Sequence, residues 1–475
     1  MPINSFLYPG AKVTLGYEVA NSLRFNSGDS PSLSRTISDG ADMTKFTFSF
    51  WCKRSTLGGD QRIYSNENTT AKQIYIRFNN NNTFTVYHQA GGSDVLSFDT
   101  NAVFRDVSAW YHFHFVMDST QSTESNRFKM HVNGVQITDF NSPVYPSSNE
   151  AAAFLNTNEK SNIGFRDGAG GQHFDGYLTE IVLLQGVAEP YTSFGEFDED
   201  SPTIWKPKDV SSLSRGTNGF YLDFEDSSSL GNDQGGSVNL TPNNLAATDQ
   251  STDTCTNNFA TFNSLAPTTD ITLSEGNLKG VYGTSGTRTV QTSTFGLSSG
   301  KWYWEIKIGG SSSPNNAIVG ITQLSTDTNT VLGTADNSWG YRGYDGKVYH
   351  NNADEGGSLD TFTDGDIIGI ALNLDNLQGS LHKLYFSKNG TFQNGADPTD
   401  FTSTTGVYGV DDNVDYFPAI ADAGSSATPQ FEINFGSPSF SISSGNSDAN
   451  GYGNFEYAVP SGFYAINSKN IAEFG

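Results

Sequence analysis

Apolar and polar residues alternate along many short stretches of this chain, with the two-residue period of β-strands. Large aromatic side chains occupy alternate positions in residues 109–116, AWYHFHFV, and again in residues 301–308, KWYWEIKI. Further along, strand-like runs flank an Asn-Gly pair in each half of the chain, at Asn133-Gly134 and at Asn389-Gly390. Asn-Gly suits the two-residue turn of a β-hairpin. The pattern therefore predicts two β-sandwiches in one chain.

The first module is predicted over residues 21–195 and the second over residues 271–475. In the second module, the apolar run IIGIAL at residues 367–372 follows a turn of sequence DGD. A strand that is apolar at every position is buried on both faces, so we expect it at the centre of a sheet. Residues 196–270 contain acidic and proline-containing stretches and are interpreted as an irregular connector. The predicted fold class is all-β, two tandem antiparallel β-sandwiches, or jelly rolls, joined by that connector.

Charge and composition narrow the classes of function. The 475 residues include 51 acidic and 26 basic ones, which gives a formal net charge of −25. Nucleic acid and anionic lipid both require clustered Lys and Arg, so we expect neither as a partner. No apolar run reaches the roughly 18 residues of a membrane helix, so no membrane insertion is expected. The first residues lack the basic and apolar regions of a signal peptide, and the two cysteines, Cys52 and Cys255, are predicted to be free thiols.

Sequence blocks in the two modules resemble two known domain families. The first module has the block order of a laminin-G or concanavalin-A-like jelly roll, namely LRF at 23–25, FTFSFWCK at 46–53, VNG at 132–134, IGF at 163–165 and FDGYLTEIVLLQG at 174–186. The second is similar to a SPRY domain, with GKWYWEIKI at 300–308, SWGY at 338–341, DGDIIGIAL at 364–372, LYFSKNGTF at 384–392 and EINFG at 432–436. Each resemblance spans nearly the whole module and implies an antiparallel sandwich.

Modules of these two kinds in series also resemble virion-associated proteins of marine bacteriophages. The resemblance implies a virion-surface protein, made in the host cytoplasm, that is tail-fibre-like or another peripheral adhesin and binds host cell-surface glycans. Residues 1–20 are either a lead that docks onto other virion proteins or a loosely ordered end. A homo-oligomer is expected, because several weak contacts together raise avidity. The alternative is a capsid-decoration or head-fibre protein without an obligatory receptor role.

Candidate ligand-binding residues lie in loops, where rigid aromatic rings and Arg give contact area at low entropic cost. In the second module the candidates are Trp339, Tyr341, Arg342 and Tyr344. In the first module they are Arg166, Asp167 and His173, which flank a Gly-rich stretch. The alternative for Trp339 and Tyr341 is a place in the core of the SPRY-like sheet.

An acidic alternation at Glu196, Asp198 and Asp200 resembles the paired carboxylates of jelly-roll glycosidases. Those patterns typically end in Glu, whereas this one ends in Asp and lies beyond the last predicted strand of its module. We therefore interpret it as a solvated acidic linker and expect no enzyme. A glycan-degrading enzyme is the third alternative.

Metal sites have weak support in the sequence. His112 and His114 share one face of a predicted strand, but no third ligand follows at a readable spacing. Asp167 and Asp175, together with loop carbonyls, form a candidate calcium site of the kind that some laminin-G-like domains carry. Asp in Gly-rich turns is more often a turn former. No cofactor is expected, and calcium is the alternative.

Overall fold

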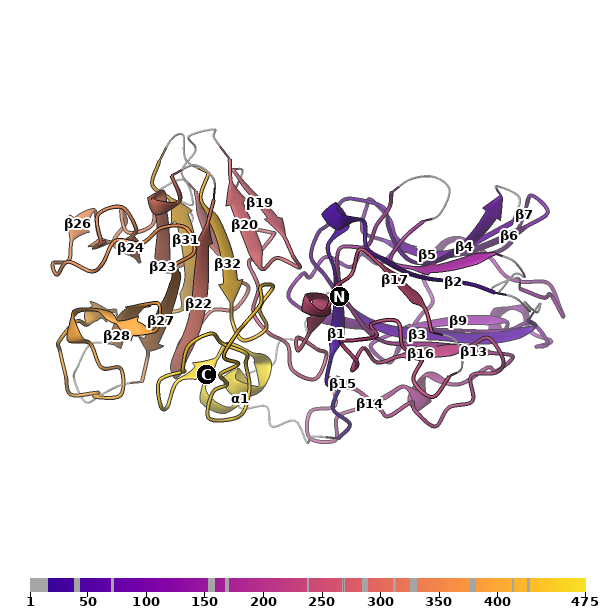
Figure 1. Ribbon diagram of the computed structural model, residues 1–475. Coiled ribbons are helices and arrows are strands. Elements are labelled where there is room, and N and C mark those ends of the chain that lie inside the picture. The colour runs from indigo at the N-terminus through magenta and orange to yellow at the C-terminus, as the bar shows by residue number, and fades with distance from the viewer. Residues whose placement is uncertain are drawn as a thin grey trace. The chain divides into compact units, whose positions relative to one another are not determined.

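The computed structural model describes residues 16–37, 43–69, 72–152, 159–166, 171–236, 239–266, 268, 270–283, 289–310, 313–324, 331–375, 382–411, 414–424 and 428–475. These residues form two compact units, one that reaches to Thr256 and one that runs from Asn257 to Gly475. Figure 1 draws the first unit from indigo to magenta and the second from rose to yellow. β-Sheets build both units, so the predicted all-β fold with two tandem sandwiches is confirmed.

The strands of the first unit's two sheets are β1 Ser22–Phe25, β2 Ser32–Thr36, β3 Lys45–Arg54, β4 Gln61–Thr69, β5 Lys72–Phe78, β6 Phe84–Ala90, β7 Ser93–Thr100, β8 Trp110–Asp118, β9 Phe128–Val132, β10 Val135–Ile137, β11 Phe140–Val144, β12 Lys160–Ile163, β13 Gly176–Gln185, β16 Phe220–Leu222, β17 Thr241–Asn243 and β18 Gln250–Ser251. One sheet has the order β10-β9-β8-β3-β13-β1-β18, with β16 also paired to β13. The other has the order β11-β7-β6-β5-β4-β12-β2-β17.

Aromatic side chains from both sheets fill the core of the first unit. Phe48 of β3 stacks on Phe115 of β8 with ring centroids 5.7 Å apart. Phe84 of the opposite sheet lies 4.2 Å from Phe113. Phe46, Phe48 and Phe50 all point into this core, as expected for alternate positions of one strand.

The segment interpreted as an irregular connector belongs to the folded units instead. β16, β17 and β18 all lie within residues 196–256, and each adds to a sheet of the first unit. Phe220 and Leu222 of β16 are buried in that unit's core. A further hairpin joins β14 Gly195–Phe197 to β15 Trp205–Pro207. These strands have two or three residues each, which is too short to show a period in the sequence.

The strands and helix of the second unit are β19 Ile271–Ser274, β20 Lys279–Tyr282, β21 Val290–Thr292, β22 Lys301–Gly309, β23 Ala317–Gln323, β24 Ser338–Arg342, β25 Lys347–His350, β26 Ala353–Asp354, β27 Ile367–Asn373, β28 His382–Lys388, β29 Thr391–Phe392, β30 Tyr408–Val410, β31 Tyr416–Asp422, β32 Gln430–Asn434, β33 Tyr464–Ala465 and α1 Ser468–Phe474. One sheet has the order β19-β20-β32-β22-β27-β28-β29, with β30 on β28 and β33 on β22. The other has the order β21-β31-β23-β24-β25-β26.

The two faces of β22 carry different structural roles. Trp302, Trp304 and Ile306 point into the core between the sheets. Tyr303 points the other way, into a smaller cluster that the C-terminal segment completes with Phe455 and other residues. β27 is buried at every position between β22 and β28, so the predicted central strand is confirmed.

One pairing departs from the antiparallel arrangement expected throughout. β33 runs parallel to β22, with Trp302 opposite Tyr464 and Tyr303 opposite Ala465. β33 pairs with the start of β22, before the stretch 305–309 that pairs with β32. Short 3₁₀ helices occupy some of the connections, at η1 Ser27–Asp29, η2 Glu124–Asn126, η3 Tyr191–Ser193, η4 Ala247–Asp249, η5 Pro314–Asn316 and η6 Gln393–Gly395.

Candidate functional site

A stack of aromatic rings around Arg342 lies at the β24–β25 hairpin of the second unit. The guanidinium carbon of Arg342 is 4.1 Å from the ring centre of Tyr349 and 4.4 Å from that of Tyr344. The same group donates hydrogen bonds to Asp345, with Nε 3.2 Å from Oδ1. Tyr344 is 47% exposed. We call Arg342, Tyr344, Asp345 and Tyr349 the Arg342 cluster.

The charge pair fixes the geometry of the Arg342 cluster. Although burial opposes ionisation of Asp345, the hydrogen bonds from Arg342 hold the pKa of that carboxyl below its usual range. Asp345 also accepts a hydrogen bond from the Tyr349 hydroxyl, at 3.1 Å. The cation is therefore held in place before any ligand arrives, which lowers the ordering cost of binding.

Trp339 and Tyr341 are core residues of the second unit. The Trp339 ring stacks on His350 at 4.0 Å. Tyr341 is fully buried, and its hydroxyl donates to the carbonyl oxygen of Asp360. Of the four candidates that the sequence placed here, Arg342 and Tyr344 share a surface cluster and the other two pack inside.

The candidates of the first unit surround residues that lie outside the described part of the chain. Asp167 is one of those residues. His173 is partly buried, stacks on Phe165 at 4.6 Å, and places Nδ1 3.3 Å from the carbonyl oxygen of Pro31. Burial lowers the pKa of His173. Arg166 is partly exposed.

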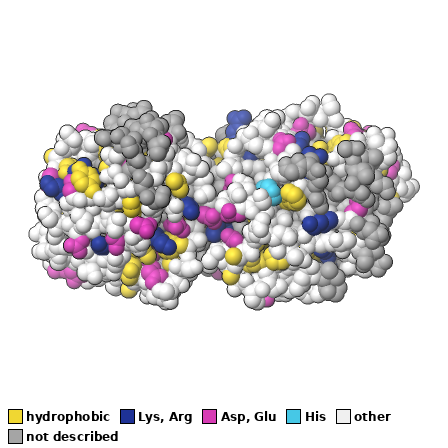
Figure 2. Space-filling view, turned by 45° about the horizontal axis from the view of Figure 1, so that its top comes forward, with side chains coloured by type: hydrophobic (Ala, Val, Ile, Leu, Met, Phe, Trp, Pro, Cys, Tyr) yellow, Lys and Arg dark blue, Asp and Glu magenta, His cyan; other side chains and the backbone are white. Residues whose placement is uncertain are grey.

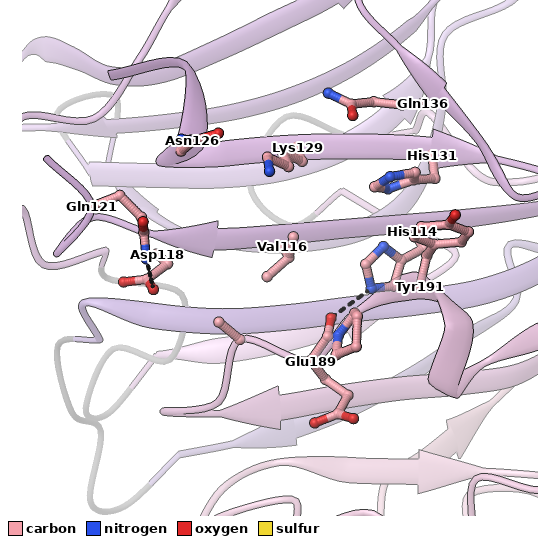
Figure 3. A pocket seen from close by; sticks show the side chains of 12 residues that line it. His114, Val116, Asp118, Gln121, Asn126, Lys129, His131, Gln136, Glu189 and Tyr191 are labelled. Carbon is pink, nitrogen blue, oxygen red and sulfur yellow. Dashed lines mark hydrogen bonds between the residues drawn. The ribbon is translucent and has the colours of Figure 1, made fainter. Parts of the chain in front are cut away.

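A groove of about 440 Å³ lies on the outer face of β8 and β9, where the chain at residues 188–191 passes over the sheet (Figure 3). Figure 3 shows His114 and His131 beside each other at one end of this groove, and Asp118 and Gln121 at the other. The remaining polar lining includes Asn126, Lys129, Gln136, Glu189 and Tyr191.

Two histidines at one end of the groove pair across the strands. His114 of β8 lies opposite His131 of β9, with ring centroids 5.5 Å apart. His114 Nε2 is 3.1 Å from the carbonyl oxygen of Glu189. The His131 ring stacks on Tyr191 at 4.3 Å. Burial lowers the pKa of His114 to about 3 and that of His131 to about 4, so both rings are neutral at pH 7.

His112, the next histidine of β8 on the same face, has both ring nitrogens occupied. Its Nδ1 accepts from the indole nitrogen of Trp205 at 3.0 Å, and its Nε2 lies 2.8 Å from the Ser49 hydroxyl. Because an indole N–H only donates, Nδ1 is unprotonated and Nε2 carries the hydrogen. Burial lowers the pKa of His112. The sequence showed that His112 and His114 share a face, but not that the 188–205 segment covers them.

The acidic alternation has a structural role that differs from a solvated linker. Asp198 is buried; its Oδ1 accepts the amide hydrogens of Asp200 and Ser201, and its Oδ2 is 3.3 Å from Nζ of Lys206. Although burial opposes ionisation, these hydrogen bonds lower the pKa of Asp198. Glu196 lies 3.6 Å from the same Lys206 nitrogen. Both carboxylates thus stabilise the β14–β15 hairpin.

Of the two candidate calcium ligands, Asp167 lies outside the described residues. Among the described residues, no group of three or more His, Cys, Asp or Glu side chains has an arrangement that suits a metal ion. Asp175 is buried and accepts a hydrogen bond from the Ser27 hydroxyl at 2.8 Å, and burial raises the pKa of its carboxyl. Cys52 and Cys255 are both free thiols, as predicted. No helix in the described ranges has the length and apolar character needed to cross a membrane.

Two family matches correspond to the two units. Residues 15–190 match the family described as "Concanavalin A-like lectin/glucanases superfamily", of the laminin-G type. Residues 301–410 match the SPRY domain family. These matches support a laminin-G or concanavalin-A-like domain followed by a SPRY domain, in the order inferred from the sequence blocks. No curated protein matches the chain at a significant level.

Several solved structures resemble part of the chain. The SPRY domain of human HERC1 is 24% identical, covers 33% of this chain and 87% of its own, and has a TM-score of 0.26. A human SPRY domain is 20% identical, covers 34% of this chain and 95% of its own, and has a TM-score of 0.26. The TRIM65 PSpry domain is 14% identical and has a TM-score of 0.28; the match covers 37% of this chain and 88% of the TRIM65 chain.

Proposed function

We propose that this protein is an adhesin on the surface of a bacteriophage particle, tail-fibre-like or otherwise peripheral, and that it binds glycans of the host cell surface. Carbohydrate is proposed as the ligand because residues 15–190 match a superfamily of lectins and glucanases. That match covers β1 to β13 of the first unit, and β16, β17 and β18 lie beyond it. The phage particle itself is proposed from the resemblance of the two modules in series to virion proteins.

The Arg342 cluster supports a second contact surface in the SPRY unit. Its exposed Tyr344 ring is positioned by the fixed guanidinium, and preorganised aromatic and Arg side chains are the usual energetic centres of binding surfaces. The face of the molecule drawn in Figure 2 is mostly polar, with hydrophobic side chains in small separate groups. Such a surface suits weak polar contacts, which copies in a homo-oligomer would multiply.

The proposal includes binding without catalysis and without a cofactor. Asp198, the buried member of the acidic alternation, already accepts hydrogen bonds from two amides and a lysine. Glu196 pairs with Lys206 and Lys208. A retaining or inverting glycosidase needs one carboxyl group that can donate a proton, whereas the hydrogen bonds to Asp198 stabilise its ionised form. Residues 1–20 are proposed to attach the protein to other virion proteins.

Adsorption of phage particles tests the proposal. Particles assembled without this protein are expected to adsorb poorly to host cells, and adsorption should return when the purified protein is added during assembly. Particles that carry Tyr344→Ala should adsorb less than those that carry Leu265→Ala, which removes another exposed apolar side chain of the same unit. Normal adsorption by particles without the protein would overturn the proposal and favour a capsid-decoration role.

A further inference from the structure

We propose that the groove between β8, β9 and residues 188–191 is a saccharide-binding site that takes an uncharged, hydroxyl-rich sugar unit in preference to an acidic one. This inference rests on the proposed function, because it specifies where in the first unit a glycan is held and of which class it is. Four observations carry it: the groove itself, two buried ring nitrogens without partners, the charges around the groove, and the amide side chains that line it.

The protonation of His114 follows from its partner. Its Nε2 faces the carbonyl oxygen of Glu189 at 3.1 Å, and a carbonyl oxygen only accepts hydrogen bonds. Nε2 therefore carries the hydrogen, which leaves Nδ1 of the neutral ring as an acceptor. The side chain of His114 is fully buried, and its Nδ1 has no hydrogen-bond partner among the described residues.

His131 presents a second buried ring nitrogen beside the first. It is 7% exposed, and its Nδ1 likewise lacks a hydrogen-bond partner in the described part of the chain. Stacking on Tyr191 at 4.3 Å fixes the plane of the ring. A buried polar atom without a partner costs free energy. A ligand that brings hydroxyl hydrogens to this end of the groove removes that cost.

The charges around the groove favour an uncharged ligand. The Asp118 carboxylate already accepts from Thr120, Gln121 and Lys45, with Gln121 Nε2 at 2.8 Å and Lys45 Nζ at 3.3 Å. Lys129 lies in the lining and opposes a cationic group beside His131. An acidic sugar would meet the acceptor nitrogen of His114 in a chain whose net charge is −25. We therefore expect the groove to favour neither a cationic nor an anionic ligand.

The remaining side chains suit sugar hydroxyls, which both donate and accept. Asn126 and Gln136 line the groove with amide groups that carry both functions. The volume of about 440 Å³ lies within the usual range of small-ligand sites. A sugar unit of one or two rings is the ligand that these features fit.

Binding of defined sugars to the full-length protein tests the inference. The probes are methyl glycosides of glucose, galactose, mannose and N-acetylglucosamine, compared with glucuronate and N-acetylneuraminate. At least one neutral glycoside is expected to bind in calorimetry and to shift the Nδ1 resonances of His114 and His131 in ¹⁵N NMR. No binding by any of the four neutral glycosides, or tighter binding by the acidic sugars, would overturn the inference.

Variants locate the binding in the groove. His131→Phe keeps an aromatic ring against Tyr191 and removes the polar ring nitrogens, so it should weaken binding about tenfold. Gln136→Ala, at an exposed rim position, should weaken binding while leaving the buried face intact. Gln89→Ala, which changes a partly exposed glutamine of β6 outside the groove lining, is the control and should bind normally. Equal affinity in His131→Phe, Gln136→Ala and the control would overturn the groove assignment.

The two proposals can fail separately. If particles without the protein adsorb normally while the groove binds neutral sugars, the proposed adhesin role fails and the groove assignment holds. If adsorption requires the protein but the groove variants bind sugar and adsorb normally, the groove assignment fails alone. Thermal unfolding of each variant shows whether it is folded before its binding is compared.

Discussion

The ammonium nitrogen of Lys53 lies 2.8 Å from a carboxylate oxygen of Asp253, and both side chains are almost completely buried. The other carboxylate oxygen of Asp253 accepts from the indole nitrogen of Trp110 at 3.1 Å. Lys53 is in β3 and Asp253 follows β18, so the pair joins positions 200 residues apart in the chain. It attaches the last segment of the first unit to the sheet that contains β3 and β8.

Removal of the Asp253 carboxylate should destabilise the first unit strongly, because Lys53 would stay buried without its counter-charge. We expect Asp253→Ala to lower the free energy of unfolding by about 3–5 kcal/mol. The double variant Lys53→Met with Asp253→Leu, which replaces both charges, should show a much smaller decrease in the free energy of unfolding. Urea unfolding followed by tryptophan fluorescence measures both.

An Asp354→Ala control breaks an exposed pair with Lys347 and should leave the transition nearly unchanged. Equal loss in the two Asp variants would contradict the buried ion pair.

Glu180 makes the stability of the first unit fall as the pH rises. It sits at a bulge of β13 with φ of 51°, is 5% exposed, and accepts hydrogen bonds from the hydroxyls of Tyr221 and Tyr17. Burial, together with the nearby carboxylates of Asp223 and Glu225, raises the pKa of Glu180 to about 8. The folded state therefore holds the proton more tightly than the unfolded state, whose pKa is near 4.5.

The stability that comes from protonated Glu180 is complete below pH 4.5 and is lost as the pH rises to about 8. The loss amounts to about 5 kcal/mol at most. Glu180→Gln keeps a neutral acceptor for the tyrosines and should remove this part of the pH dependence. The difference in unfolding free energy between wild type and Glu180→Gln, measured from pH 4.5 to 9, should move in favour of the variant as the pH rises. A constant difference would show that Glu180 is ionised in the folded protein.

How far the sequence predicts this structure depends on the length of each pattern. The Asn-Gly turns are confirmed, with Val132 opposite Val135 around Asn133 (φ 48°) and Gly134 (φ 74°). Such turns are predictable because a primed turn needs positive φ at both central residues. Long alternating strands such as β3 and β22 are predictable because nine or ten residues repeat the period.

The groove and the buried polar contacts could not be predicted in the same way. His131 faces His114 only through the register of β8 and β9, and a nine-residue connection between those strands leaves their register open in the sequence. The chain that covers His112 and His114 comes from residues 188–205, which show no periodic pattern. Arg342 and Tyr344 were found because a short hairpin keeps near neighbours together, whereas Trp339 and Tyr341 could not be separated from the core by residue type.

Glu305 holds the C-terminal segment on the second unit. Its carboxylate accepts from the amides of Glu456 and Tyr457, at 2.9 and 2.8 Å, and from the side chain of Asn434 at 3.2 Å. Glu305→Ala would leave these donors without a charged acceptor in a buried place, so we expect a loss of about 3 kcal/mol. Hydrogen exchange at residues 446–457 should rise more than in β27. Glu355→Ala, at an exposed position, is the control and should change neither the free energy of unfolding nor the hydrogen exchange.

Acid should weaken the first unit through His114. Burial and the neighbouring His131 lower the pKa of His114 to about 3, while the unfolded state has a pKa near 6.5. The stability that comes from the neutral ring is therefore present above pH 6.5 and is lost as the pH falls toward 3. His114→Phe removes this titration, so the unfolding free energy of the wild type should fall relative to that of the variant by as much as about 4 kcal/mol between pH 7 and pH 3.5. Chemical unfolding at each pH measures the difference.

His173→Phe changes a partly exposed ring and should show a smaller pH-dependent difference. An NMR titration in which His114 gains a proton near pH 6.5 would contradict the buried neutral ring, and with it the acceptor nitrogen in the groove.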